Sequence, residues 1–196
     1  NDVPFSLNDL LERVASGFSH VVTNKGILFR PDFKDTDVNL YGDVDRIEQI
    51  MDNLLTNAVK FTESGAIELN ACYHDGVLLL EVKDSGIGMS PETLSRIFRP
   101  FERLTSATNV DGVGLGLPIT KGIVRLLGGE KNVTSDIGQG TTFRVTLPLN
   151  ITDEPVESEN RILPHPEHLP QNVLVIDDDT MFLDVIKEML ERNGIT

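Results

Sequence analysis

Apolar residues recur with a helical period in three stretches of the chain. The first runs from the capping residue Ser6 to Gly26, and the second begins at Asp43, a second capping residue, and carries apolar positions up to Ala58. The third covers residues 115–127 and ends at a Gly-Gly pair. The pair Ser90-Pro91 predicts one more, short helix, because Ser caps and Pro suits the first helical position.

Other apolar stretches have the length and alternation typical of strands. The sequence predicts strands over residues 26–30, 38–41, 66–73 and 77–82, and two more flanking the turn at 138–140. Asp75-Gly76 separates the third and fourth strands and is a strong hairpin signal. The first 150 residues are therefore predicted to be α+β, with a hairpin-rich mixed sheet covered by helices.

The pattern changes near residue 150. Residues 151–172 contain four prolines and little apolar content, which predicts an acidic, Pro-rich linker. Residues 173–196 resume a buried-strand pattern followed by a helical one, but about 24 residues cannot bury their apolar faces alone. We expect a domain over 1–150, a linker over 151–172 and a truncated second domain over 173–196 that packs on the first domain or on a neighbouring chain. The start at Asn1, without Met or a signal peptide, suggests an excised fragment.

Composition narrows the function classes. The chain has 31 acidic and 17 basic residues, a formal net charge of -14, which disfavours a general binder of nucleic acid or anionic membranes. The longest apolar runs are strand-sized, so no membrane span is predicted. The single cysteine, Cys72, excludes an internal disulfide and favours a reducing compartment.

The second long helix carries a polar cluster on the flank of its apolar face. Asn53 and Asn57 are one turn apart, and Lys60 and Phe61 follow about one turn later. An amide oxygen suits Mg²⁺, which takes few protein ligands and fills its remaining positions with water and phosphate oxygens, and lysine can neutralise phosphate. A solvated polar helix face would give the same pattern.

A second motif, DSGIGM, begins at Asp84 where a strand ends. The glycines at 86 and 88 would let the backbone approach a flat ligand, and the carboxylate could accept a hydrogen bond from an exocyclic amine such as that of adenine. An ordinary Asp-Ser-Gly turn is the alternative.

The third motif region covers residues 98–116, where FRPFERL and a polar run lead into GVGLGL. Glycines directly before a helix allow its first amides to face an anion. The dinucleotide fingerprint is excluded because position 117 is leucine, and a Walker loop is excluded because no Gly-Lys-Ser/Thr follows. A flexible connector is the alternative.

The fourth motif, GQGTTF, places Thr141 at the start of a strand, from which it could support Asp84 through its hydroxyl or a water. A plain hairpin turn would also account for it.

Taken in order, these motifs resemble the N, first glycine, F, second glycine and third glycine boxes of sensor histidine kinase catalytic domains: NLLTNAVKFT, DSGIGM, FRPFERL, GVGLGL and GQGTTF. The resemblance covers about residues 1–150. It implies a two-layer Bergerat-type sandwich, with a mixed sheet backed by three helices, that binds ATP and Mg²⁺ under a mobile lid.

The resemblance also implies roles for individual residues. Asn57 would bind Mg²⁺, Asn53 would lie near the phosphates, and Lys60 would contact phosphate. Arg103 would reach the terminal phosphate from the lid, so that Asn53, Lys60 and Arg103 form the catalytic set. The remaining residues would line the base pocket, anchor the lid or bring backbone to the phosphates: Phe61, Asp84, Gly86, Ile87, Gly88, Phe98, Phe101, Gly112, Gly114, Leu115, Gly116 and Thr141.

One position favours phosphoryl transfer over hydrolysis. ATP hydrolases that resemble this fold, such as gyrase and chaperone ATPases, carry Glu one turn before the metal-binding Asn, but here that residue is Asn53, whose amide cannot act as a general base. None of the four histidines stands in the family's phosphoacceptor context, so we expect the acceptor on dimerising helices upstream and no autophosphorylation by this fragment. An ATP-dependent binding module and a gyrase- or chaperone-like ATPase are the alternatives.

Residues 173–196 resemble the first strand and helix of a response-regulator receiver. Asp177 and Asp178 match its metal-binding acidic pair, in a site that is incomplete here, although both could simply be helix N-terminal charge. The parent would then be a hybrid sensor kinase, a homodimer whose cytoplasmic part contains this fragment and passes phosphate from ATP to histidine and on to a receiver aspartate, without nucleic-acid contact.

Overall fold

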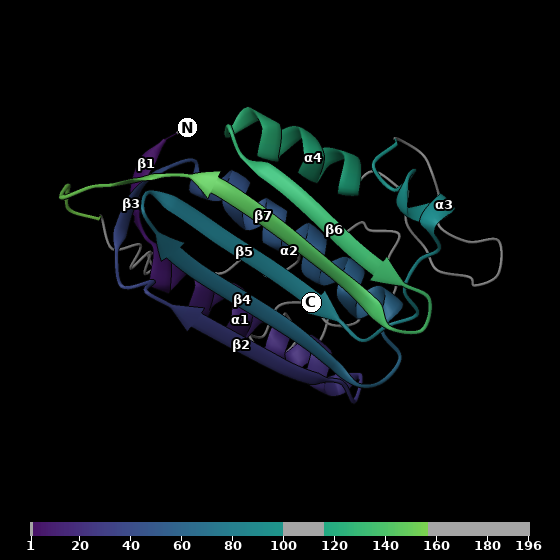
Figure 1. Cartoon of the computed structure of the whole chain (residues 1–196). Helices are drawn as coiled ribbons and strands as arrows, with labels where there is room; N and C mark the ends of the chain where they lie inside the picture. The colour runs from purple at the N-terminus through teal and green to yellow at the C-terminus, as the bar shows by residue number, and fades with distance from the viewer. Residues whose placement is uncertain (1, 100–115, 157–196) are drawn as a thin grey trace, which may run out of the picture. The chain divides into compact units, whose positions relative to one another are not determined.

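A five-stranded sheet with helices against one face makes up most of the domain (Figure 1). The computed structural model describes residues 2–99 and 116–156. The elements are β1 (Val3–Ser6), α1 (Leu7–Asn24), β2 (Leu28–Lys34), β3 (Asn39–Gly42), α2 (Val44–Phe61), β4 (Ala66–His74), β5 (Val77–Asp84), α3 (Pro91–Leu94), α4 (Gly116–Leu126), β6 (Glu130–Asp136), β7 (Gly140–Pro148) and β8 (Asn150–Ile151).

The main sheet is mixed, as predicted. Its strand order is β2-β4-β5-β7-β6, in which β2 runs parallel to β4 and all other neighbours are antiparallel. The β4–β5 hairpin turns at Asp75 and Gly76, whose φ angles of 49° and 80° are those required by a tight two-residue turn. Figure 1 shows α1 and α2 behind this sheet, and α4 contacts both α2 and β6, so three long helices back it.

The core lies between the sheet and the helices. Alternate residues of β4 and β5 face this layer and are buried, while the residues between them are more exposed. The buried stripe of α2 meets them, and it consists of Ile47, Ile50, Met51, Leu54, Leu55 and Ala58. The predicted caps are present, since Ser6 accepts from the Asp9 amide and Asp43 from the Arg46 amide.

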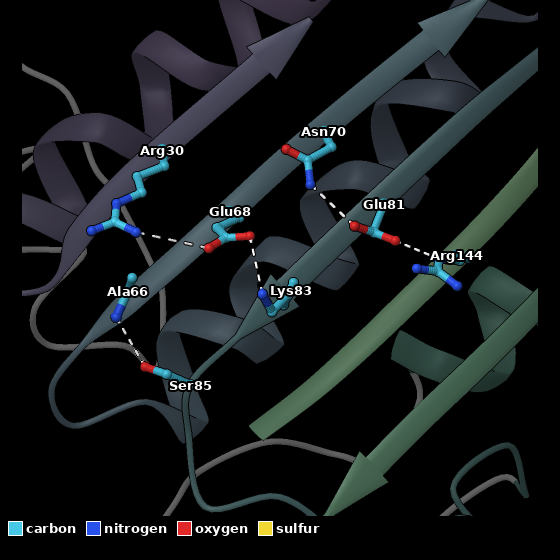
Figure 2. A network of polar contacts seen from close by, with 8 residues as sticks. All are labelled: Arg30, Ala66, Glu68, Asn70, Glu81, Lys83, Ser85 and Arg144. Carbon is cyan, nitrogen blue, oxygen red and sulfur yellow. Dashed lines mark hydrogen bonds and ion pairs between the residues drawn. The ribbon is translucent and has the colours of Figure 1, made fainter. Parts of the chain in front are cut away.

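The opposite face of the sheet carries a network of polar contacts (Figure 2). Glu68 on β4 lies 3.3 Å from Lys83 on β5 and 3.9 Å from Arg30 on β2. One row further along, Glu81 accepts from Asn70 at 3.1 Å and from Arg144. Burial raises the pKa of Glu81, but the hydrogen bonds from Arg144 and Asn70 together with the charges of Arg144 and Lys83 outweigh burial and leave that pKa below its ordinary value. Cross-strand pairing of this kind suits a face without a covering helix layer.

A second, smaller sheet was not predicted in full. It has the order β1-β3-β8 and joins residues near the start of the chain to Asn150 and Ile151. Residue 151, expected as the first residue of the linker, is part of this sheet, because Ile151 pairs with Leu40. The strand β2 is also longer than expected and includes Pro31, which an edge strand tolerates.

The chain divides into two units after residue 157, and the described residues all belong to the first. Linker residues 157–172, the proposed receiver segment and the packing of the tail lie outside the described residues, so they stay predictions. No helix in the described part of the chain is long and apolar enough to cross a membrane.

Lys25, just after α1, caps the end of α2. Its Nζ donates to the carbonyl oxygens of Val59 at 2.5 Å and Thr62 at 3.0 Å. These carbonyls belong to the last turn and the cap of α2, where a cation also interacts favourably with the helix dipole. We expect Lys25→Met to lower the free energy of unfolding by about 1 kcal/mol in urea titrations.

The matched control is Lys34→Met, which removes an exposed lysine whose one described ion pair, to Asp32, is itself exposed. This variant should change stability by only a few tenths of a kcal/mol. Equal losses in the two variants would contradict a capping role for Lys25.

Candidate functional site

A pocket of about 320 Å³ lies where β5 ends, among α2, α3, α4 and the β6–β7 turn. Its lining is mostly apolar, with a small number of polar groups, a composition typical of sites for small ligands. The described residues that line it are Asn57, Phe61, Asp84, Ile87, Gly88, Met89, Ser90, Thr93, Leu117, Ile137, Thr141 and Phe143.

Asp84 is the buried acid of this pocket. It ends β5 with 6% of its surface exposed, and its Oδ1 accepts from the Gly86 amide at 2.8 Å. Burial raises the pKa of Asp84, and backbone hydrogen bonds from Gly86 and Thr141 only partly oppose this effect. The side chain is therefore a desolvated acceptor next to an apolar cavity.

The loop after Asp84 is fixed by backbone contacts on both sides. The amide of Ile87 donates to Phe61 O at 3.2 Å, and Ile87 O accepts from the Gly138 amide at 2.8 Å. A Cβ at position 86 would lie 2.2 Å from Phe61 O, and one at position 88, where φ is +64°, would lie 1.9 Å from Asp136 O. Glycine is thus required at both positions, which accounts for the spacing in DSGIGM.

The two asparagines of α2 adjoin the same pocket. Asn57 lines the pocket, and its Nδ2 donates to Asn53 O at 2.7 Å, so its amide oxygen is left as an acceptor. Asn53 Nδ2 is buried and has no hydrogen-bond partner within the described residues. A Cβ on Gly116, the first residue of α4, would lie 3.3 Å from Asn53 Oδ1, so the start of α4 packs directly against this pair.

Lys60 and Phe61 follow at the end of α2. Phe61 lines the pocket, and Lys60 Nζ lies 5.6 Å from the centre of its ring. Lys60 itself is not among the described lining residues.

Thr141 pairs with Asp84 across β5 and β7, and its amide lowers the pKa of that carboxyl group. Its hydroxyl contacts Ser135 Oγ at 2.9 Å. The structure thus gives Thr141 a contact with Asp84 through the backbone, where we expected the hydroxyl or a water. Ser135 was missed by the sequence analysis, because only the register of the β6–β7 hairpin places it beside Thr141.

Phe98 was predicted to anchor the lid. It is half-buried, and Lys131 Nζ of β6 lies 3.6 Å from its ring centre. Burial and then the nearby Lys121 lower the pKa of Lys131. The other predicted lid and receiver residues lie outside the described part of the chain: Phe101, Arg103, Gly112, Gly114, Leu115, Asp177 and Asp178.

The site therefore combines a buried carboxylate, an apolar slot and two helix amides beside the start of another helix. Within residues 2–99 and 116–156, His, Cys, Asp and Glu side chains form no group of three or more that could hold a metal.

Comparison with known proteins identifies the family. The family described as histidine kinase-, DNA gyrase B- and HSP90-like ATPase matches residues 42–151. The chain belongs to this ATPase family. The described part is homologous to the ATP-binding catalytic domain of sensor histidine kinases, and the predicted sheet backed by helices is confirmed.

Curated relatives of this ATPase domain are sensor kinases. The autoinducer 2 sensor kinase/phosphatase LuxQ of Vibrio parahaemolyticus is 38% identical over 82% of this chain and 20% of its own length. The sensor histidine kinase GacS of Pseudomonas protegens is 32% identical over all of this chain and 22% of its own length. The chain thus spans about a fifth of the curated relatives it matches.

Among solved structures, full-length ShkA in complex with AMPPNP is similar to this ATPase domain. Its TM-score is 0.69 with 33% sequence identity, over 78% of this chain and 32% of that one.

The raised pKa of Asp84 makes a stability prediction. Because the pKa in the folded state lies above the ordinary value of 3.8, the folded chain retains a proton that the unfolded chain has released between these two values. The free energy of unfolding should therefore fall as the pH rises through this interval. Asp84→Asn lacks this titrating group, so the variant should gain stability relative to the wild type as the pH rises.

Urea titrations of the wild type and of Asp84→Asn measure this difference. They are made at several pH values between about 3.5 and about 7, the range in which carboxyl groups titrate. If the difference in the free energy of unfolding stays constant with pH, or comes to favour the wild type as the pH rises, burial does not raise the pKa of Asp84.

Proposed function

We propose that this domain binds Mg·ATP in the pocket at Asp84 and is the catalytic part of a hybrid sensor histidine kinase. The γ-phosphate would pass to a histidine on dimerisation helices and then to a receiver aspartate. The observation that carries this proposal is the buried carboxylate of Asp84 beside an apolar slot, with Asn57 lining the same pocket.

The pocket suits a purine that bears an exocyclic amine. A planar base can fill the apolar slot, and Asp84, an acceptor when ionised, can take a hydrogen bond from the amine. The glycines at 86 and 88 leave the backbone close to the base. The ShkA complex with AMPPNP, an adenine nucleotide analogue, supports this assignment by homology.

The two helix amides fit a metal–phosphate group. Asn57 lines the pocket and uses its amide nitrogen on Asn53 O, which leaves its oxygen, a hard neutral ligand, as an acceptor for a metal ion. Leaving the buried Nδ2 of Asn53 without a partner is costly, and a phosphate oxygen would supply one. When bound, Mg²⁺ would neutralise phosphate charge, and Lys60, on the next turn of α2, would add positive charge.

The nature of position 53 supports transfer to another nucleophile over hydrolysis. The side chain one turn before Asn57 is an amide, which offers no general base for a water. Of the histidines in the described part, His20 and His74 are both exposed and neither lines the pocket. We therefore place the acceptor histidine on separate dimerisation helices.

The wider architecture is proposed from the relatives. Their names describe sensor kinases, and each is about five times longer than the matched segment, which leaves room for sensor, dimerisation and receiver domains. We propose a homodimeric parent, a cytoplasmic location for this domain, and a receiver beginning after residue 172. Arg103, Phe101 and the glycines of 112–116 are proposed to close over the phosphates.

Calorimetry with a nonhydrolysable ATP analogue tests the binding site. We expect Asp84→Asn to weaken binding at least about tenfold with or without Mg²⁺, because a buried hydrogen bond to a charged acceptor is lost. We expect Asn57→Ala to abolish most of the gain in affinity that Mg²⁺ provides.

Asp32→Asn and Asn132→Ala are matched controls, since both residues are exposed on the open side of the sheet. Their affinities should equal that of the wild type. Undiminished affinity in Asp84→Asn would contradict the proposed base site.

A second assay separates kinase from hydrolase. Incubation with the parent's phosphoacceptor helices and γ-labelled ATP should label the helices, whereas the domain alone should release little phosphate. Steady release without helices would favour a gyrase- or chaperone-like ATPase. Intact binding with unlabelled helices would favour an ATP-dependent binding module.

A further inference from the structure

Ser135 on β6 joins three parts of the site at one oxygen atom. Its Oγ accepts from the Met89 amide at 2.9 Å, donates to Gly140 O at 2.9 Å, and lies 2.9 Å from Thr141 Oγ1. Met89 ends the glycine loop after Asp84, while Gly140 and Thr141 begin β7. The described residues lining the pocket include Met89 and Thr141 but not Ser135.

Counting protons fixes the direction of the contact between the two hydroxyl groups. A serine hydroxyl carries one proton, and that of Ser135 is given to Gly140 O. In the contact with Thr141, Ser135 must then be the acceptor, so the Thr141 proton points at Ser135. The Thr141 hydroxyl therefore has only lone pairs left for a ligand in the pocket.

We propose that Ser135 is a positioning residue that sets the purine preference of this site by holding Thr141 as an acceptor. This inference rests on the proposed binding of ATP at Asp84. Thr141 pairs with Asp84 across β5 and β7, so both residues present acceptors to the same edge of a base. We place both acceptors against the purine 6-substituent: an amine there donates to them, whereas a 6-oxo group is itself an acceptor and is repelled.

Without Ser135, the Thr141 hydroxyl can rotate and donate into the pocket. It would then tolerate a 6-oxo group, although the carboxylate of Asp84 would still favour the amine. A loss of selectivity between 6-amino and 6-oxo purines therefore distinguishes this role. If Ser135 only held Met89 in place, its removal would weaken the binding of both kinds of nucleotide to the same extent.

ATP and inosine triphosphate are the probes, since they differ at the purine 6-position and the adjoining ring nitrogen. The measurement is the ratio of their dissociation constants with Mg²⁺, obtained by calorimetry on the 196-residue chain. We expect Ser135→Ala to reduce the preference for ATP about three- to tenfold, and Ser135→Thr, which keeps a hydroxyl, to restore most of it.

Two further variants show whether Ser135 acts through Thr141. In Thr141→Val the hydroxyl is gone, so adding Ser135→Ala should change the ratio little further, which is the expected result of a double-mutant cycle for coupled residues. The control is Thr134→Ala, a neighbouring exposed residue on the opposite face of β6, which should leave the ratio unchanged.

An unchanged ratio in Ser135→Ala, or an undiminished effect in the Thr141→Val background, would overturn the inference while leaving ATP binding intact. Failure of the wild type to bind ATP would instead reject the proposed function together with this inference. Thermal unfolding of each variant identifies any that fail to fold, and in that case Ser135→Cys, with its weaker donor and acceptor, replaces Ser135→Ala and should lower the ratio in the same direction.

Discussion

The site depends on how the loop after Asp84 is held between a helix end and a hairpin turn. Its backbone donates to Phe61 O at the end of α2 and accepts from the Gly138 amide in the β6–β7 turn. Two elements far apart in sequence are thus tied to one residue, Ile87, and the Asp84 carboxylate lies at the start of the same loop. The glycines are the condition for this arrangement, because any side chain at 86 or 88 would overlap backbone of those neighbours.

This arrangement has a thermodynamic cost at Asp84. Burial raises its pKa, so the ionised side chain is less favourable in the folded domain than in water. Burial of apolar side chains between α2 and the inner faces of β4 and β5 offsets this unfavourable free energy. On the other face of the sheet, acids such as Glu81 have direct cationic partners and behave in the opposite way. The contrast between the two acids, which lie three residues apart on one strand, supports the proposed binding role of Asp84 and fits a structural role for Glu81.

The sequence predicts those features that depend on local spacing. The apolar period of α2 and the caps at Ser6 and Asp43 were enough to predict the two long helices α1 and α2. The pair Asp75-Gly76 was enough to predict the β4–β5 hairpin. The small sheet β1-β3-β8 could not be predicted, because strands of four and two residues contain too few positions to show a period. Pairing between residues 40 and 151 is equally invisible in a local pattern.

The same distinction applies within the site. Asp84, the glycines and the two asparagines are conspicuous, since each belongs to a short motif with its own chemistry. Ser135 is an ordinary polar residue of a predicted strand, and its role becomes visible only when the register places it opposite Thr141. Residues proposed to contact a ligand directly can thus be predicted from short motifs, whereas residues that orient them require the fold. In the proposed site the second group determines whether Thr141 presents a lone pair or a proton to the ligand. For a site built from so few polar atoms, that decision bears on selectivity as directly as the identity of the acid itself.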